Sequence, residues 1–152
     1  MNVILDISQF DKDSLYFQKP VRNTVMDNSN FIRVVYSNEL FSLNSLFVKF
    51  TLNNARTERY FAKFKCSFGL SDNDYIVQQL INLEGDILRR TGITGKKYAC
   101  KIREQLQAGT IKIFANEPDG QIGNNFLLKI SGVWETMDEV GVTFKFIDFH
   151  HA

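Results

Sequence analysis

Basic and aromatic residues alternate two positions apart along several segments of this chain. The pattern is clear in Phe47-x-Lys49 and Lys112-x-Phe114, and it is longest across residues 59–65. Successive side chains of a β-strand point to opposite faces, so residues two apart share one face. Cations on such a face can hold phosphates, and flat rings beside them can stack on unpaired bases whatever the sequence. The spacing therefore predicts a surface that binds single-stranded nucleic acid.

We predict that twelve residues contribute to this nucleic-acid-binding surface. They are Arg33, Phe47, Lys49, Arg59, Phe61, Lys63, Lys65, Lys112, Phe114, Lys129, Trp134 and Lys145. Residues 59–65, with Phe47 and Lys49 on the preceding strand, form the most compact group. Trp134 is ambiguous, because it shares its strand register with Phe126 and Ile130, and that register is expected to face the core.

The near-neutral net charge conceals an uneven distribution. The 152 residues include 18 Lys+Arg and 17 Asp+Glu, which gives a formal charge of +1. The six clearest strands, predicted at 31–36, 46–52, 59–68, 111–115, 126–134 and 142–147, hold eight of the cations and no carboxylate. Extending them to include Glu58, Glu135 and Asp148 reduces their charge from +8 to +5. The strands are therefore predicted to be basic, and the loops and helices acidic.

A purely structural explanation of the same residues remains open. Outward lysines keep strands soluble and prevent strand edges from pairing. Most of the 20 aromatic residues are needed for the core of a domain of this size. Outward Phe47 and Phe61 would then lie beneath another segment of the chain.

Strands precede and follow a helical segment in the middle of the chain. A short first strand is expected within Met1–Ile7, followed by a polar loop or arm at 11–30. Apolar residues spaced for one helix face run from Ile76 to Ile87, after an Asn- and Asp-rich cap, and a shorter helix is expected at 97–107. Strands return from residue 110 onward.

This order of elements predicts a mainly β or α+β domain, because a parallel α/β sheet needs strands and helices to alternate. The favoured arrangement is an antiparallel Greek-key barrel of the oligonucleotide/oligosaccharide-binding (OB) type, with a helix between its third and fourth strands. A β-sandwich with a helical insert is the alternative. We expect one domain, in which the strand and arm at 1–30 precede a barrel at 31–152.

Residues suited to catalysis are scarce. The histidines are His150 and His151, beside Asp148 near the end of the sequence, and they are a poor metal site. Neither a phosphate loop nor a nucleophile elbow is present. Cys66 and Cys100 match no metal spacing and are expected to be free thiols, with a disulfide as the alternative. We expect no enzyme activity, no cofactor, no metal, no signal peptide and no membrane segment.

Two segments carry a resemblance to a known family. They are YSNELFSLN at 36–44 and the C-terminal LLKISGVWET at 127–136, which continues as VGVTFKF at 140–146. They resemble small OB-fold single-stranded-DNA-binding proteins of large cytoplasmic DNA viruses and of virus-like linear plasmids of yeast. The resemblance implies an OB barrel, sequence-independent binding and service to a replication machinery in the cytoplasm. Phage relatives end in an acidic tail with a terminal aromatic, and the sequence from Asp148 to Ala152 departs from that pattern.

The predicted function is sequence-independent binding of single-stranded DNA in replication, recombination or repair. RNA is left open as a ligand, as is assembly into a homo-oligomer. A replication protein such as a DNA polymerase is the expected partner. The alternative is a protein-interaction or virion structural module that uses the same aromatic and basic strand face for contacts.

Overall fold

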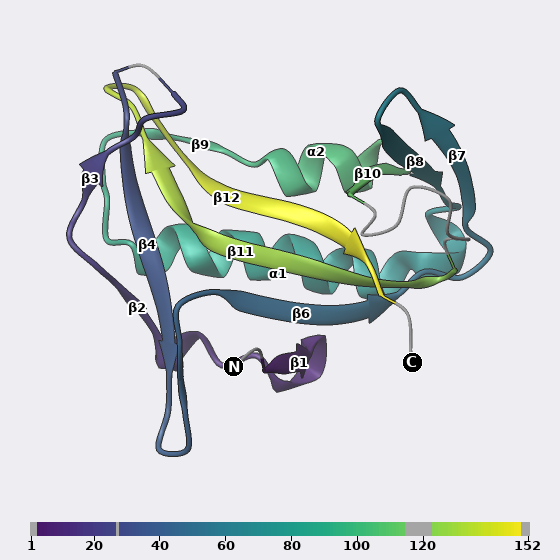
Figure 1. Cartoon of the computed structure of the whole chain (residues 1–152), viewed down its shortest axis with the longest axis horizontal. Coiled ribbons are helices and arrows are strands. Elements are labelled where there is room, and N and C mark those ends of the chain that lie inside the picture. The colour runs from purple at the N-terminus through teal and green to yellow at the C-terminus, as the bar shows by residue number, and fades with distance from the viewer. Residues whose placement is uncertain (1–2, 27, 115–122, 150–152) are drawn as a thin grey trace.

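The computed structural model describes residues 3–26, 28–114 and 123–149. Its strands are β1 (Ile4–Asp6), β2 (Leu15–Phe17), β3 (Val21–Arg22), β4 (Asn30–Ser37), β5 (Ser42–Leu43), β6 (Leu46–Thr51), β7 (Arg56–Tyr60), β8 (Lys63–Ser67), β9 (Lys97–Ala99), β10 (Thr110–Phe114), β11 (Asn125–Glu135) and β12 (Glu139–Asp148). Its helices are α1 (Asp74–Arg90) and α2 (Lys101–Gln107). The chain is therefore mainly β with two helices, as the sequence predicts (Figure 1).

The strands form one mixed, open sheet. Its main order is β1-β6-β11-β12-β10-β8-β7, and β4 pairs with the far end of β11 and also carries β2, β3 and β5. The pairings β1–β6, β10–β12 and β9–β12 are parallel, so the sheet is mixed and not antiparallel throughout. Within the described residues, the end strands β1 and β7 do not pair with each other. The Greek-key OB barrel therefore stays a prediction.

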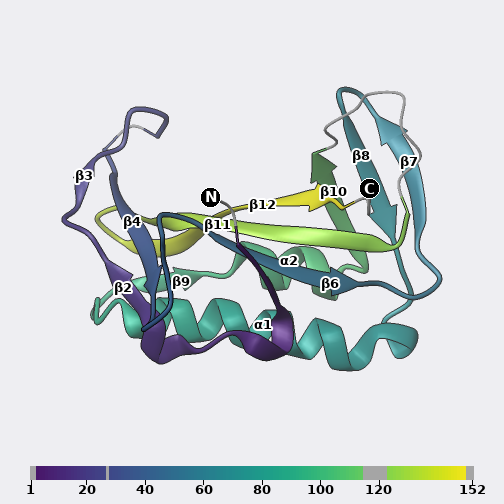
Figure 2. The ribbon, with the colours of Figure 1, turned by 60° about the horizontal axis from the view of Figure 1, so that its bottom comes forward.

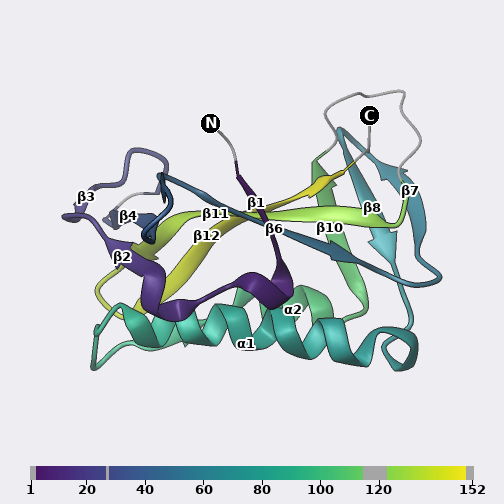
Figure 3. The ribbon, with the colours of Figure 1, turned by 90° about the horizontal axis from the view of Figure 1, so that it is seen from below.

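Both helices lie against the same side of the sheet (Figures 2 and 3). Leu80 and Ile87 of α1 and Leu106 of α2 are buried in a core that also contains Val48 and Phe146 of the strands. We call the side of the sheet that faces the helices the inner face, and the other side the outer face. Because strand side chains alternate, burial of one set of residues leaves the other set on the outer face.

Helix α1 matches its prediction, whereas α2 begins later than expected. The apolar stripe from Ile76 to Ile87 packs inward, and Gly92, with φ of +70°, stands just beyond the last turn. Residues 97–99 are a strand and not the first turn of a helix, because they pair with Glu139–Gly141 of β12. Strand pairing with a distant segment outweighs the local helical preference there.

The N-terminal segment is part of the sheet and not a free arm. Leu15 is almost fully buried, and β2 and β3 both pair with β4. The hydroxyl of Tyr36 accepts a hydrogen bond from the backbone N–H of Asp11 at 3.0 Å. The sequence did not indicate this pairing, because residues 11–30 are mostly polar and β2 and β3 contribute only five residues to it.

The strand predicted at 59–68 is instead a hairpin. β7 ends at Tyr60, β8 begins at Lys63, and Phe61 in the turn has φ of +55°. Turns of this length usually contain glycine, asparagine or aspartate, and none of these stands there to signal the turn. Across the turn Arg59 pairs with Phe64, so the odd-numbered residues change sides.

A β-bulge moves Trp134 out of its predicted register. The pairing of β11 with β12 shifts between Ile130 and Gly132, so Val133 points inward and Trp134 points outward. Trp134 is half-buried, and its ring covers Gly141, where a β-carbon would collide with it. The expected burial of Trp134 in the core is therefore wrong, because unbroken alternation was assumed through the bulge.

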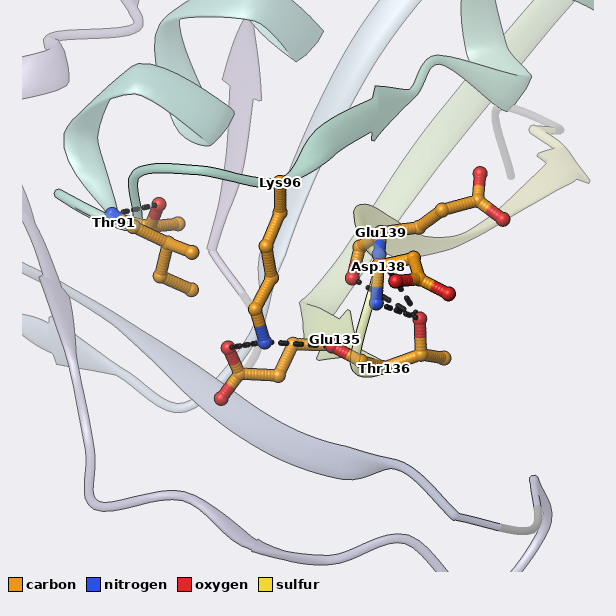
Figure 4. Close-up of polar contacts among 7 residues, drawn as sticks. Thr91, Lys96, Glu135, Thr136, Asp138 and Glu139 are labelled. Atoms are coloured by element: carbon orange, nitrogen blue, oxygen red, sulfur yellow. Dashed lines mark hydrogen bonds and ion pairs between the residues drawn. The ribbon is translucent and has the colours of Figure 1, made fainter.

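Lys96 connects the segment after α1 to the turn between β11 and β12 (Figure 4). Its Nζ donates to the Glu135 carboxylate at 2.9 Å and to the Thr136 carbonyl at 2.6 Å. The hydroxyl of Thr136 accepts a hydrogen bond from the backbone N–H of Glu139 at 3.0 Å. The charge of Glu135 is thus paired at this end of the sheet.

The buried carboxylate of Glu84 holds the two helices together. It is 1% exposed, and its oxygens accept hydrogen bonds from the backbone N–H groups of Ile102 and Arg103, both at 2.9 Å. Burial raises the pKa of this carboxyl, and the two hydrogen bonds oppose that rise. Glu84 therefore caps the start of α2, where the first N–H groups lack partners within the helix.

Glu84→Ala is expected to lower the free energy of unfolding by about 2–3 kcal/mol, because it leaves buried N–H groups without partners and opens a cavity. Urea denaturation measures this change. The matched control is Glu104→Ala, since that exposed carboxylate pairs with Lys101 on the surface and should contribute about 0.5 kcal/mol or less. Equal losses for the two variants would contradict the capping role.

Candidate nucleic-acid interface

The outer face gathers ten of the twelve residues predicted from the sequence. They are Arg33 on β4, Phe47 and Lys49 on β6, Lys63 and Lys65 on β8, Lys112 and Phe114 on β10, Lys129 and Trp134 on β11, and Lys145 on β12. Neighbouring residues in these strands, such as Val48 and Ile113, are buried on the inner face. The helices therefore leave this side of the sheet uncovered (Figure 2).

Two pairs of lysines stand directly opposite each other on neighbouring strands of the outer face. Lys65 on β8 faces Lys112 on β10, and Lys129 on β11 faces Lys145 on β12. Like charges in this position are unfavourable by roughly 0.2–1 kcal/mol for each pair. None of these lysines forms an ion pair within the part of the chain that the structure describes. The free protein thus keeps unfavourable contacts that a bound polyanion would relieve.

Aromatic rings lie beside the cations of this face. The Nζ atoms of Lys63 and Lys145 lie 4.8 and 5.1 Å from the centre of the Phe114 ring. Lys129 lies 5.8 Å from the centre of the Phe47 ring. Each contact is a cation–π interaction, worth about 0.5–1 kcal/mol at an exposed site. Phe114, between two ammonium groups, is the centre of the basic and aromatic surface.

Arg33 and Lys49 have similar ring contacts on other strands. The guanidinium carbon of Arg33 lies 5.7 Å from the centre of the Phe31 ring, and the Nζ of Lys49 lies 5.3 Å from that of Phe149. Asp6 pairs in register with Lys49. Hydrogen bonds from the hydroxyl and N–H of Ser8 lower the pKa of Asp6, and Lys49 lowers it further. Lys49 therefore lies next to an ionised carboxylate, which weakens its attraction for phosphate.

The β7–β8 hairpin holds the two predicted residues that are not on the sheet surface. Phe61 stands at its tip and is 85% exposed, whereas Arg59 lies on the opposite side of the hairpin from Lys63 and Lys65. Arg59 is therefore not brought together with these lysines. Unbroken alternation through the strand predicted at 59–68 would place Tyr60 on the core side, but Tyr60 pairs with Lys63 and is 55% exposed. Tyr60 could have been assigned to the outer side only if the position of the turn were known, and the sequence carries no signal for that turn.

Two hollows lie on the outer face. One, of about 420 Å³, is lined by Phe47, Lys129 and the segment 42–45. The other, of about 290 Å³, lies between the β7–β8 hairpin and β10 and is lined by Tyr60, Lys65, Thr110 and Lys112. Each of them combines an aromatic ring with at least one ammonium group. That combination suits a ligand with both a phosphate and a flat base.

The described residues contain no group of three or more histidine, cysteine or acidic side chains arranged for a metal ion. The predicted weak site at His150 and His151 lies outside them. Cys66 and Cys100 are both free thiols, and burial raises the pKa of each. Neither described helix is long and apolar enough to cross a membrane.

Comparisons with known protein families, with curated proteins and with solved structures find no match for this chain. The outer face is the surface of this chain whose chemistry suggests a ligand. Across the described residues of β8, β10, β11 and β12, the recurring feature of this face is a set of ammonium groups that form no ion pair and lie beside aromatic rings.

Proposed function

We propose that this protein binds single-stranded DNA, without sequence preference, along the outer face of its sheet. The observation that carries the proposal is the arrangement around Phe114, where Lys63 and Lys145 bracket the ring, and the facing pair Lys65 and Lys112 lies alongside. Phosphates would bind the ammonium groups and draw them away from the rings. The rings, which these groups now cover, would then become available for stacking with bases. Rings on a binding surface favour single strands, because only unpaired bases offer their faces for stacking.

The proposal includes a biological setting. The resemblance of 36–44 and of the C-terminal hairpin to OB-fold single-stranded-DNA-binding proteins supports a role in replication, recombination or repair. We propose a replication protein such as a DNA polymerase as partner and the cytoplasm as the place of action. We also propose that the open sheet is a variant of the OB barrel. The protein acts by binding, without catalysis, in this account.

Trp134 provides an internal test of where the strand lies. It is the one tryptophan of the sequence, and it is half-buried on the outer face above Gly141. Oligo-dT is expected to quench its fluorescence in a saturable way, because bases on this face approach the indole. A blunt duplex of equal length should quench it less. Trp134→Phe is the control, which should lose the signal and keep most of the affinity measured by anisotropy.

Binding of oligo-dT that leaves the Trp134 fluorescence unchanged would place the strand on another surface and contradict the proposal. Absence of binding, together with a stable complex between copies of the chain or with another protein, would favour the interaction-module alternative. A fall in anisotropy as oligo-dT is hydrolysed would indicate an enzyme.

Glu58→Gln is expected to tighten binding of oligo-dT about threefold at about 0.1 M salt. Glu58 pairs in register with Lys65 and is exposed, so its carboxylate repels phosphates beside that lysine. Anisotropy titration measures the change. Glu104→Gln removes the same charge from α2, on the other side of the sheet, and should leave the affinity unchanged. An equal gain for both variants would indicate a general effect of net charge and not the local contact.

A further inference from the structure

The hollow between the β7–β8 hairpin and β10 differs from the rest of the outer face. Its volume of about 290 Å³ is lined by Tyr60, Lys65, Thr110 and Lys112. Ligand pockets usually begin at about 300 Å³, so this hollow suits a small unit and not an extended chain. It offers an aromatic ring, two ammonium groups and a hydroxyl within one concave site.

Lys65 and Lys112 give the hollow a place for one anion. They face each other across β8 and β10, and neither forms an ion pair with a described residue. The backbone N–H of Lys112 donates to the Gln105 side chain at 3.0 Å, which fixes the strand at this position. Glu58 pairs with Lys65 on the adjacent strand but does not reach ion-pair distance. A phosphate between the two lysines would replace their repulsion with attraction.

The ring of Tyr60 lines this hollow, and the ring of Phe61 packs against it at a steep angle. The Tyr60 and Phe61 ring centres are 4.8 Å apart, with 80° between the ring planes. Phe61 has φ of +55°, a conformation that is uncommon for a residue without a polar side chain and that glycine adopts without strain. Phe61 is 85% exposed, so burial in the core does not explain this strained position. Strain of this kind is typical of functional sites.

We propose that this hollow binds a single nucleotide of the DNA strand, turned out of the base stack. The phosphate lies between Lys65 and Lys112, the base stacks on Tyr60, and Phe61 forms the wall that separates this base from the next. This inference rests on the proposed function and adds one defined subsite to it. The hollow beside Phe47 is less suited, because it offers one lysine, Lys129, and a ring that is already half-buried.

Titration with thymidine 5′-monophosphate (dTMP), followed by amide NMR, tests the subsite without a full strand. The shifts are expected to centre on Tyr60, Lys65, Thr110 and Lys112. Tyr60→Leu should weaken dTMP binding at least fivefold and leave the binding of inorganic phosphate unchanged, because the lysines remain. Tyr75→Leu is the matched control, since Tyr75 is exposed on α1, and it should change neither.

Phe61→Gly separates a binding defect from a folding defect. Glycine removes the backbone strain, so the midpoint of thermal unfolding should rise by about 2–4 °C while dTMP binding weakens. Shifts spread over the whole face, or unchanged dTMP binding in Tyr60→Leu, would overturn the subsite. If oligo-dT still binds in that case, the proposed function stands without it. Localised binding of dTMP with no binding of oligo-dT would support the subsite and overturn the proposed function.

Discussion

Replacing Lys65 and Lys112 together by glutamine is expected to weaken binding of oligo-dT about 25-fold at about 0.1 M salt. The estimate follows from two lost phosphate contacts, each worth roughly 0.7 in the slope of log affinity against log salt for a single strand. That slope should fall by about 1.4 in magnitude. The two lysines face each other on β8 and β10 without a carboxylate partner among the described residues.

The same double variant should be at least as stable as the natural protein. Neutralising the facing pair removes a repulsion of roughly 0.2–1 kcal/mol, and both side chains are exposed, so no core contact is lost. Urea denaturation measures the free energy of unfolding, and anisotropy measures the affinity. A double variant that is at least as stable but binds oligo-dT more weakly would identify these lysines as ligand-binding residues.

The control for this pair is the double variant Lys101→Gln and Arg103→Gln. Both residues are exposed on α2, on the other side of the sheet, and their loss changes the net charge by the same amount. Its affinity for oligo-dT should remain within about twofold of the natural protein. A 25-fold loss in the control as well would contradict a binding site on the outer face.

Phe114→Leu is expected to weaken oligo-dT binding about tenfold at every salt concentration. A stacked base contributes about 1–3 kcal/mol, and leucine keeps the apolar bulk of the half-buried side chain without the ring. Because no charge is removed, the salt slope should stay unchanged. Lys63 and Lys145, which now lie over the ring, remain available to phosphates.

Phe10→Leu provides the comparison for Phe114. Phe10 is also half-buried, but it packs against Tyr36, away from the outer-face lysines. Its replacement should reduce stability modestly and leave binding unchanged. If Phe114→Leu alters the slope and not the affinity at high salt, the ring acts only by positioning the lysines, and base stacking at this position is contradicted.

Regular alternation and helical spacing predicted much of this fold. The strands predicted at 31–36 and 46–52 and the apolar helix stripe from Ile76 to Ile87 lie where the patterns place them. The outer-face lysines were recognised for the same reason, since apolar neighbours in the sequence indicate which way a strand residue points. The patterns were informative where one physical constraint, burial of one face, governed a whole segment.

The predictions from the sequence were wrong where the backbone geometry changes without a change in composition. The turn at Phe61 contains no typical turn residue, so Arg59 and Tyr60 were assigned to the wrong sides of their strand. The bulge after Ile130 reversed the register of Trp134 in the same way. The parallel pairing of β9 with β12 depends on contacts between distant segments, which local patterns do not encode.

The most direct test of the central claim is the affinity of fluorescent poly-dT measured by anisotropy across a range of salt concentrations. Four to six phosphate contacts on the outer face predict a log–log slope of about −3 to −4, since each contact contributes roughly 0.7. Binding that strengthens as salt falls, with this slope, is the expected result. Affinity that does not depend on salt, or no binding at low salt, would contradict the account.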